Sequence, residues 1–304
     1  MKAAQVIEPG RIEVVDVPMP EPGEGEVRVR LLGCGVCASN VPPFEGREWF
    51  TYPMLPGALG HETWGETDTG ERVTSLATDA YAEYVTVPAD KVVKLPQDLS
   101  ATPFPGEPLA CAMNIHDRTG HRRGDVVLVL GIGFLGALLT QLYTADGATV
   151  LACSRRPESL DFATAADKRV MDDHWQIVEW VKSHTGGCGA DVVVECTGKQ
   201  WPLDLAADSV REMGRLIIAG YHQDGLRNVN MQTWNWKGLD VVNAHEREPH
   251  RYTDGIRRAV AAVSEGRMDH RPLLTHRYPL EALGQALRDT AQRPAGFMKG
   301  WIAF

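Results

Sequence analysis

The sequence of 304 residues lacks the features that mark membrane, secreted and nucleic-acid-binding proteins. No stretch approaches the roughly 20 apolar residues of a membrane span, and residues 1–5 lack the apolar core of a signal peptide. Lys and Arg number 31 against 40 Asp and Glu, which argues against a broad surface for phosphates. We therefore expect a cytoplasmic protein that binds neither membranes nor nucleic acid.

Cysteine is scarce and scattered, and the chain contains no internal repeat, low-complexity tract or flexible linker. Four of the six cysteines lie in or beside apolar, strand-like runs. This pattern is typical of reduced, buried or ligating thiols and excludes a disulfide framework. The six are Cys34, Cys37, Cys111, Cys153, Cys188 and Cys196.

The most informative stretch that is present is the apolar run 126–130, followed at once by G-x-G-x-x-G at 131–136 and by leucines at helical spacing. This order predicts a buried parallel strand, a tight turn and a helix. If the loop holds a dinucleotide, Gly131 makes the turn, Gly133 lets the backbone approach the pyrophosphate, and Gly136 lets the helix pack on the strand. A glycine turn without a ligand is the alternative.

From residue 124 onward, strand-like and helix-like segments alternate, which predicts a parallel, doubly wound α/β sheet with right-handed connections. Before it, short strand-like runs separated by Pro and Gly suggest a compact barrel-like domain. The expected strands of the α/β part are 126–130, 149–153, 169–171, 191–196, 215–220 and 240–244, with helices at 175–183, 203–213 and 253–265. We expect the strand-like tail, residues 298–304, to return to the first domain.

Metal-ligand residue types gather in three places in the first part of the chain, at 33–40, 57–62 and 107–109. A Cys, a His and a carboxylate from separate loops would hold zinc and leave a position open for an alcohol or carbonyl oxygen. Isolated Cys and His residues more often belong to the core or the surface. Cys34 and Cys37 also form a C-x-x-C pair, but it follows a strand and does not open a helix as a redox motif does.

These residues resemble the zinc-dependent medium-chain dehydrogenase/reductase family of alcohol, polyol and threonine dehydrogenases. The resemblance runs nearly end to end, through Lys2-Ala3-Ala4, Cys34-Gly35-Val36-Cys37, Gly60-His61-Glu62, Glu107-Pro108-Leu109, Gly131–Gly136 and Gly189–Gly198. It implies a GroES-like β-rich catalytic domain over residues 1–112 and 278–304, and a Rossmann dinucleotide-binding domain over 113–277. It also implies a homodimer or homotetramer.

By this resemblance one catalytic zinc is held by Cys37, His61 and Glu107, the last as in the polyol-dehydrogenase branch. Glu62 matches a neighbouring carboxylate that supports or displaces a ligand during turnover. Ser39 matches the hydroxyl that passes a proton to or from the reacting oxygen; a simple turn hydroxyl is its alternative.

Two departures from the family pattern change what we expect. No cysteine stands in residues 63–80, where relatives carry a structural-zinc lobe, so we expect no structural zinc. Asn40 and Pro42 replace the Asp and His of the usual proton relay. His222 and His245, in loops expected near the nicotinamide, are candidate replacements; solvated loop histidines are the alternative.

The end of the second α/β strand indicates which cofactor is used. It reads Cys153-Ser154-Arg155-Arg156, with no acidic residue for a ribose 2′-hydroxyl and two arginines for a 2′-phosphate. This favours NADP(H) over NAD(H), unless both arginines are merely solvated. The expected cofactor-binding residues are Gly131, Gly133, Phe134, Leu135, Gly136, Ser154, Arg155, Arg156, Cys196, Thr197, Ala219, Gly220 and Asn243.

The resulting hypothesis is a zinc-dependent oxidoreductase that transfers a hydride between NADP(H) and a secondary alcohol or polyol, or its carbonyl. A zinc-free NADPH-dependent enone or quinone reductase of the same superfamily, and a non-catalytic NADP-binding protein, remain alternatives.

Overall fold

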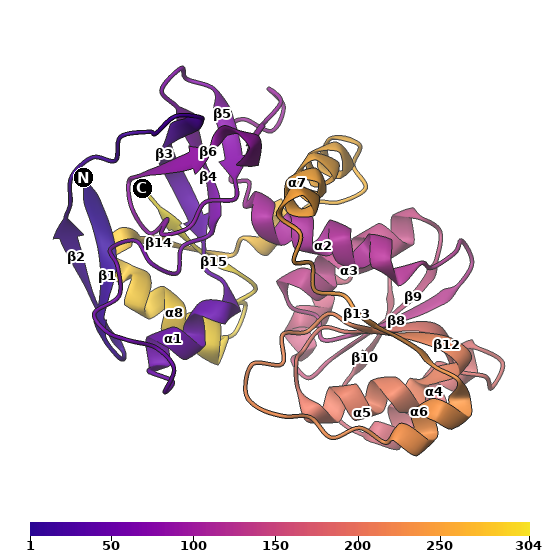
Figure 1. Ribbon diagram of the computed structural model, residues 1–304. Coiled ribbons are helices and arrows are strands. Elements are labelled where there is room, and N and C mark those ends of the chain that lie inside the picture. The colour runs from indigo at the N-terminus through magenta and orange to yellow at the C-terminus, as the bar shows by residue number, and fades with distance from the viewer. The chain divides into compact units, whose positions relative to one another are not determined.

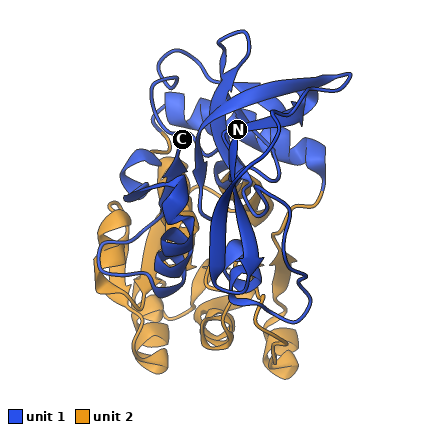
Figure 2. Cartoon of the chain, turned by 90° about the vertical axis from the view of Figure 1, so that its left-hand side faces the viewer, with its two compact units in different colours: residues 1–110, 248–266, 270–304 blue, residues 111–247, 267–269 orange.

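The computed structural model describes residues 1–304 and divides into two compact units. The first comprises Met1–Ala110, Glu248–Gly266 and His270–Phe304, and the second comprises Cys111–Arg247 and Arg267–Asp269 (Figure 2). The chain therefore enters the second unit twice, first for most of its length and then for a three-residue segment, and it ends in the first unit.

The second unit is built on a six-stranded sheet in the order β10-β9-β8-β11-β12-β13, and its strands are parallel. This is the 3-2-1-4-5-6 order of dinucleotide-binding folds, whose strand order reverses beside the first strand. The expected doubly wound sheet is confirmed. Its strands are β8 (Val126–Leu130), β9 (Thr149–Ser154), β10 (Asp167–Val170), β11 (Ala190–Glu195), β12 (Val210–Ile218) and β13 (Asp240–Asn243).

Helices flank both faces of this sheet, with α3 on one face and α4 and α5 on the other (Figure 1). The central strand β8 is apolar because it is covered on both sides, and its residues 127–130 are fully buried. The helices are α2 (Gly106–Thr119), which begins in the first unit, α3 (Phe134–Ala145), α4 (His174–His184), α5 (Gln200–Ser209) and α6 (Met231–Lys237), with a 3₁₀ segment at Pro157–Phe162.

The predicted helix 203–213 is wrong at its end. Helix α5 stops at Ser209, and residues from Val210 onward belong to β12. Val210 pairs with Ala190, whereas the next pair joins Val192 to Arg215, so the intervening residues bulge out of the ladder. Pairing with β11 therefore overrides the helical pattern of the segment.

The first unit contains a seven-stranded mixed sheet in which β3 (Glu26–Gly35) pairs with β4 (Glu62–Thr67), β6 (Tyr84–Pro88) and β15 (Gly300–Ala303). The predicted return of the tail is confirmed, because Trp301 lies opposite Gly35. The other strands of this sheet are β5 (Arg72–Ser75), β7 (Val92–Lys94) and β14 (His276–Pro279), and a separate hairpin joins β1 (Lys2–Glu8) to β2 (Arg11–Asp16).

Three further helices belong to the first unit. The longest, α7 (Pro249–Ser264), falls in the first unit although its residues lie within 113–277, the range expected from the sequence for the dinucleotide-binding domain. The others are α1 (Val41–Glu45) and α8 (Leu283–Gln292), with 3₁₀ segments at Ala38–Asn40, Ala89–Lys91, Arg271–Leu273 and Leu280–Ala282. No helix in either unit is long and apolar enough to cross a bilayer.

Candidate active site

The turn after β3 carries Cys37 and Ser39. β3 ends at Gly35, and Cys37 immediately precedes the 3₁₀ segment that holds the partly exposed Ser39 and the buried Asn40. The Asn40 amide donates to the Leu59 carbonyl at 3.0 Å, and its oxygen accepts from the Tyr81 hydroxyl at 2.8 Å. Asn40 thus ties the Cys37 turn to the loop that leads to His61.

A hydrogen bond to the backbone of Leu59 sets the orientation of the His61 ring. Its Nδ1 lies 2.8 Å from the Leu59 carbonyl oxygen. Since a carbonyl only accepts, Nδ1 carries a proton, and Nε2 is the nitrogen that could bind a metal, as in metal-binding histidines. The ligand atoms of Cys37, His61 and Glu62 all lie within 4.8 Å of one another.

Glu62 is paired with Lys299, a residue that the sequence reasoning missed. Both side chains are buried, and Lys299 Nζ lies 2.8 Å from Oε1 and 2.7 Å from Oε2 of Glu62. Burial lowers the pKa of Lys299, but the charges of Glu62, Cys37 and Glu107 outweigh it and raise that pKa. The available signal was one Lys within an otherwise apolar, strand-like tail.

The side chains around His61 carry negative charge, as a cation site requires. Burial alone lowers the pKa of His61, but its hydrogen bond to Cys37 and the charges of Cys37, Glu107 and Glu62 raise that pKa to about 10. Glu107 lies in the first turn of α2 and acts on both His61 and Lys299. The side chains that converge within 4.8 Å are Cys37, His61 and Glu62, and Glu107 is not part of this group. A sulfur, an imidazole and a carboxylate together fit a zinc ion.

The glycine loop of the second unit has the conformation that its sequence predicts. Gly131 has a φ of +97°, and a Cβ there would lie 2.5 Å from Thr197 Cγ2. A Cβ on Gly136 would lie 2.1 Å from the Gly131 carbonyl oxygen. Gly133 is the residue before α3, whose first residues are Phe134 and Leu135, so the free N–H groups of the helix begin here.

At the end of β9 the serine is buried, whereas the two arginines after it are more exposed. The Ser154 hydroxyl is buried and lies 2.7 Å from the Ser159 hydroxyl, so it shapes the turn. Arg155 is exposed, and Arg156 is partly buried. Desolvation lowers the pKa of Arg156, although Glu158 opposes this.

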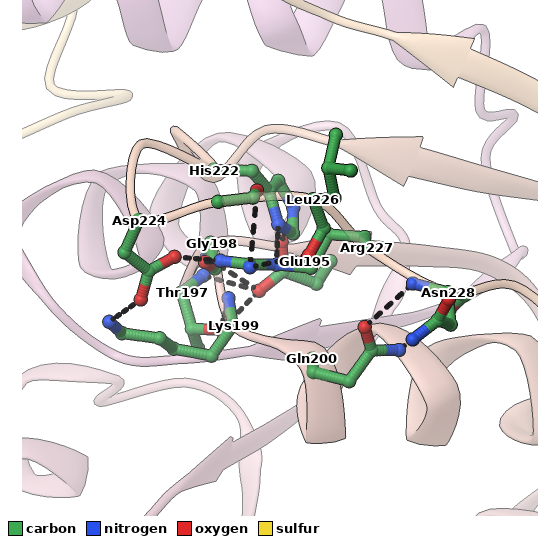
Figure 3. Close-up of polar contacts among 11 residues, drawn as sticks. Glu195, Thr197, Gly198, Lys199, Gln200, His222, Asp224, Leu226, Arg227 and Asn228 are labelled. Atoms are coloured by element: carbon green, nitrogen blue, oxygen red, sulfur yellow. Dashed lines mark hydrogen bonds and ion pairs between the residues drawn. The ribbon is translucent and has the colours of Figure 1, made fainter.

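Glu195 organises the carboxyl ends of β11 and β12 and is the second residue that the sequence reasoning missed (Figure 3). It is fully buried, and its Oε1 accepts from the backbone N–H groups of Thr197 at 2.6 Å and Gly198 at 3.0 Å. Its backbone carbonyl accepts from Ala219 at 2.9 Å and from Gly220 at 2.7 Å. Burial and this carboxylate raise the pKa of the neighbouring Cys196 thiol, which therefore stays protonated.

His222 is held by the same network. Its Nε2 lies 3.0 Å from Glu195 Oε2, and Arg227 Nε donates to its Nδ1 at 2.9 Å (Figure 3). Nε2 is therefore the protonated nitrogen, and both ring nitrogens are engaged. His222 is thus held in place through both ring nitrogens, and its part in a proton relay stays a prediction.

His245 lies two residues after Asn243, the last residue of β13. Its ring stacks on Tyr221 with centroids 6.3 Å apart, and its Nε2 lies 3.4 Å from Arg247 Nη1. Burial and the positive charge of Arg247 lower its pKa below the ordinary value. His245 therefore keeps a neutral ring at pH 7.

The chain is similar to known dehydrogenases in sequence and in structure. Residues 135–261 match the family model described as zinc-binding dehydrogenase. Sorbitol dehydrogenase of Halalkalibacterium halodurans is 26% identical, with 91% of this chain and 92% of the relative covered. (R,R)-butanediol dehydrogenase of Neisseria gonorrhoeae is 26% identical, with 93% of each covered.

A solved structure has the same fold over the whole chain. It is a putative zinc-binding dehydrogenase from Sinorhizobium meliloti bound to NADP, 24% identical, with a TM-score of 0.84 and coverage of 100% of this chain and 99% of that one. Taken with the Rossmann strand order and the Cys37, His61 and Glu62 cluster, these similarities relate the chain to the zinc-dependent medium-chain dehydrogenase/reductase family.

Proposed function

We propose that this oxidoreductase is a zinc-dependent, NADP(H)-preferring dehydrogenase of secondary alcohols or polyols. The observation that carries the proposal is the ligand set of the first unit, where Cys37, His61 and Glu62 converge and Glu107 adds its charge. The relatives named as sorbitol and butanediol dehydrogenases support the substrate class.

Cys37, His61 and Glu107 would hold the zinc, which when bound supplies a Lewis acid that stabilises negative charge on the substrate oxygen. Leu59 holds the His61 ring through Nδ1, so that Nε2 is oriented before the metal arrives. Lys299 neutralises Glu62 and keeps this second carboxylate beside the ligands. Ser39, two residues after Cys37, is the proposed hydroxyl that accepts or returns the substrate proton.

The second unit would bind the dinucleotide on the Gly131–Gly136 loop, with the pyrophosphate at the N-terminus of α3. Arg155 and Arg156 are the proposed partners of a 2′-phosphate. The NADP bound to the Sinorhizobium meliloti protein supports nucleotide binding by this fold. The carboxyl ends of β11, β12 and β13, with Thr197, Gly220 and Asn243, are where doubly wound sheets bind ligands.

The test is metal content and turnover of Cys37→Ser and His61→Ala, with Cys188→Ser as the matched control because Cys188 is an exposed free cysteine. The first two variants should lose the zinc bound by this set. They should also lose about 100-fold or more of turnover, since the metal contributes several kcal/mol of charge stabilisation. NADPH binding should persist in all three.

Zinc retained by Cys37→Ser together with full activity would contradict the ligand assignment. Turnover of an enone by metal-free protein would favour the zinc-free reductase. NADPH binding without turnover across a panel of alcohols and polyols would favour the non-catalytic alternative.

A further inference from the structure

A second group of metal-ligand side chains lies wholly in the second unit. His116 is in the last turn of α2, His121 follows the end of that helix, and Asp146 is the residue at which α3 ends. Asp146 Oδ2 lies 2.9 Å from His116 Nε2 and 3.3 Å from His121 Nε2. The ligand atoms of all three lie within 4.8 Å of one another.

The backbone places His121 beside His116 by a sharp reversal at Gly120. Gly120 has a φ of +58°, which favours glycine, and a Cβ there would lie 2.0 Å from Arg215 Nη1. The same Arg215 nitrogen donates to the Thr119 carbonyl at 3.0 Å and so closes the end of α2. As a result the two imidazole rings lie with centroids 4.8 Å apart.

The two imidazoles are sheltered, whereas the carboxylate is accessible. The side chains of His116 and His121 are 9% and 7% exposed, and that of Asp146 is 29% exposed. The Tyr143 ring packs against both histidines, with centroids 5.4 Å and 4.9 Å away. An ion would therefore reach the group from the side of Asp146.

The surroundings resemble the outer shell of a metal site. Arg267 Nη2 lies 2.7 Å from Asp146 Oδ1, which leaves Oδ2 directed at the imidazoles. Asp117 Oδ1 lies 3.8 Å from His116 Nδ1, on the other side of that ring, which is too far for a hydrogen bond but adds negative charge near the imidazole.

The ends of two helices also favour a cation here. The C-terminal ends of α2 and α3 both meet at this group, and helix C-termini carry a partial negative charge. They add to the charge of Asp146. Arg267 bonds the far carboxylate oxygen of Asp146, and Arg215 bonds the Thr119 carbonyl at the end of α2, so Asp146 Oδ2 is left facing the imidazoles.

We infer that His116, His121 and Asp146 form a second metal site, selective for a divalent transition ion such as Zn²⁺. Two imidazole nitrogens and one carboxylate oxygen are ligands typical of zinc and suit Mg²⁺ poorly. The site is additional to the single zinc expected from the sequence. Because it lies in the other unit, it does not depend on the proposed catalytic metal.

The experiment uses the full-length Cys37→Ser protein, freed of metal with a chelator, so that the proposed catalytic ligand set is disabled. Zinc chloride is titrated in by calorimetry in the presence of excess Mg²⁺, and thermal unfolding is followed in parallel. We expect one equivalent of Zn²⁺ to bind and to raise the melting temperature.

Adding His116→Gln or Asp146→Asn should weaken this binding by at least about tenfold, as even outer-shell changes do at metal sites. Adding His250→Gln should leave it unchanged, because the side chain of His250 is 71% exposed. Circular dichroism and NADPH binding report whether each variant is folded.

Absence of saturable zinc binding by Cys37→Ser, or equal binding by all the double variants, would overturn the inference and leave only an ion-pair cluster that ties α2 to α3. The first of these outcomes needs no second substitution, so misfolding of a variant does not obscure it. Failure of the proposed catalytic site would appear separately, as unchanged zinc and turnover when Cys37→Ser is compared with the parent chain.

Discussion

Lys299 and Glu62 form a buried ion pair whose two members depend on each other. Removing one partner of such a pair leaves an uncompensated charge in a medium that solvates it poorly. We therefore expect Lys299→Met to lower the free energy of unfolding by about 3–5 kcal/mol. Urea unfolding measures this. The double variant Lys299→Met, Glu62→Gln should regain a large part of the loss, and equal instability of the two would show that packing, not charge, is responsible.

Arg155 and Arg156 should decide between the two nicotinamide cofactors. Replacing both with Ala should weaken NADP(H) binding by about 2–4 kcal/mol, because each charge-assisted hydrogen bond contributes about 1.5–3 kcal/mol and the two compensate partly. Fluorescence titration with NADPH and NADH measures the difference, and NADH serves as the internal control. Equal losses for both cofactors would mean that the arginines do not contact the 2′-phosphate.

His245 should make the stability of the protein depend on pH. Its folded-state pKa lies below the ordinary value of 6.5 because of burial and Arg247. The unfolded chain therefore takes up the proton first, so the stability due to the neutral ring is present above pH 6.5 and is lost as the pH falls. The His245→Asn variant should show a flatter decline of melting temperature between pH 7 and pH 5. An unchanged profile would contradict this assignment.

A ring that is neutral at pH 7 can accept a proton, so a second experiment tests whether His245 takes part in proton transfer during turnover. The expected result for a relay is that Ser39→Ala and His245→Asn both slow turnover, and that His245→Asn also removes the acidic limb of its pH profile. If only Ser39→Ala slows turnover, the proton reaches solvent by another route.

At the level of the element, the turn between β8 and α3 depends on Gly131 and Gly136, because a side chain at either position would clash with its neighbours. Gly131→Ala forces an Ala to a φ of +97° and a Cβ to within 2.5 Å of Thr197 Cγ2. We expect a loss of about 1–3 kcal/mol in stability, together with weaker NADPH binding. In contrast, Gly284→Ala should raise stability by about 0.5–1 kcal/mol, since Gly284 lies inside α8 and its nearest neighbour to a new Cβ is 3.6 Å away. Thermal unfolding of both variants tests the contrast.

The elements that the sequence predicted well are those whose signal is local. The strand at 126–130 agrees with β8 residue for residue, because its apolar run and the glycine turn after it are contiguous. The end of α5 could not be predicted, since its place is set by the pairing of Val210 with Ala190 across the sheet. Lys299 was missed because its partner Glu62 lies 237 residues away in the chain. Glu195 also has partners close by, but its contact with His222, 27 residues away, could not be read from the sequence.

At the level of the whole molecule, the two units differ in how the chain builds them. The sheet of the second unit comes from the continuous stretch 126–243, whereas the sheet of the first needs β3 and β15 side by side. Ile302, fully buried in β15, belongs to the core cluster that contains Leu31 and Cys34 of β3. This strand therefore joins the two ends of the chain in one core.

Ile302→Ala should accordingly destabilise the first unit by about 2–5 kcal/mol, as do other truncations of buried aliphatic side chains. Leu226→Ala is the matched control, because Leu226 is 99% exposed and should change stability by less than about 0.5 kcal/mol. Hydrogen exchange, resolved by peptide, should show faster exchange in β3 and β15 and unchanged protection in β8. Uniform loosening of both units would show that they unfold as one.

The late position of β15 also has a consequence for synthesis on the ribosome. The six strands of the second unit emerge well before residues 300–303, so that unit has all of its sheet while the first still lacks one strand. Until β15 arrives, the edge of β3 around Cys34 and Gly35 has no partner on that side and is open to pairing with other chains. During translation the incomplete first unit, not the second, is therefore the part of the nascent protein that keeps an unpaired strand edge for longest.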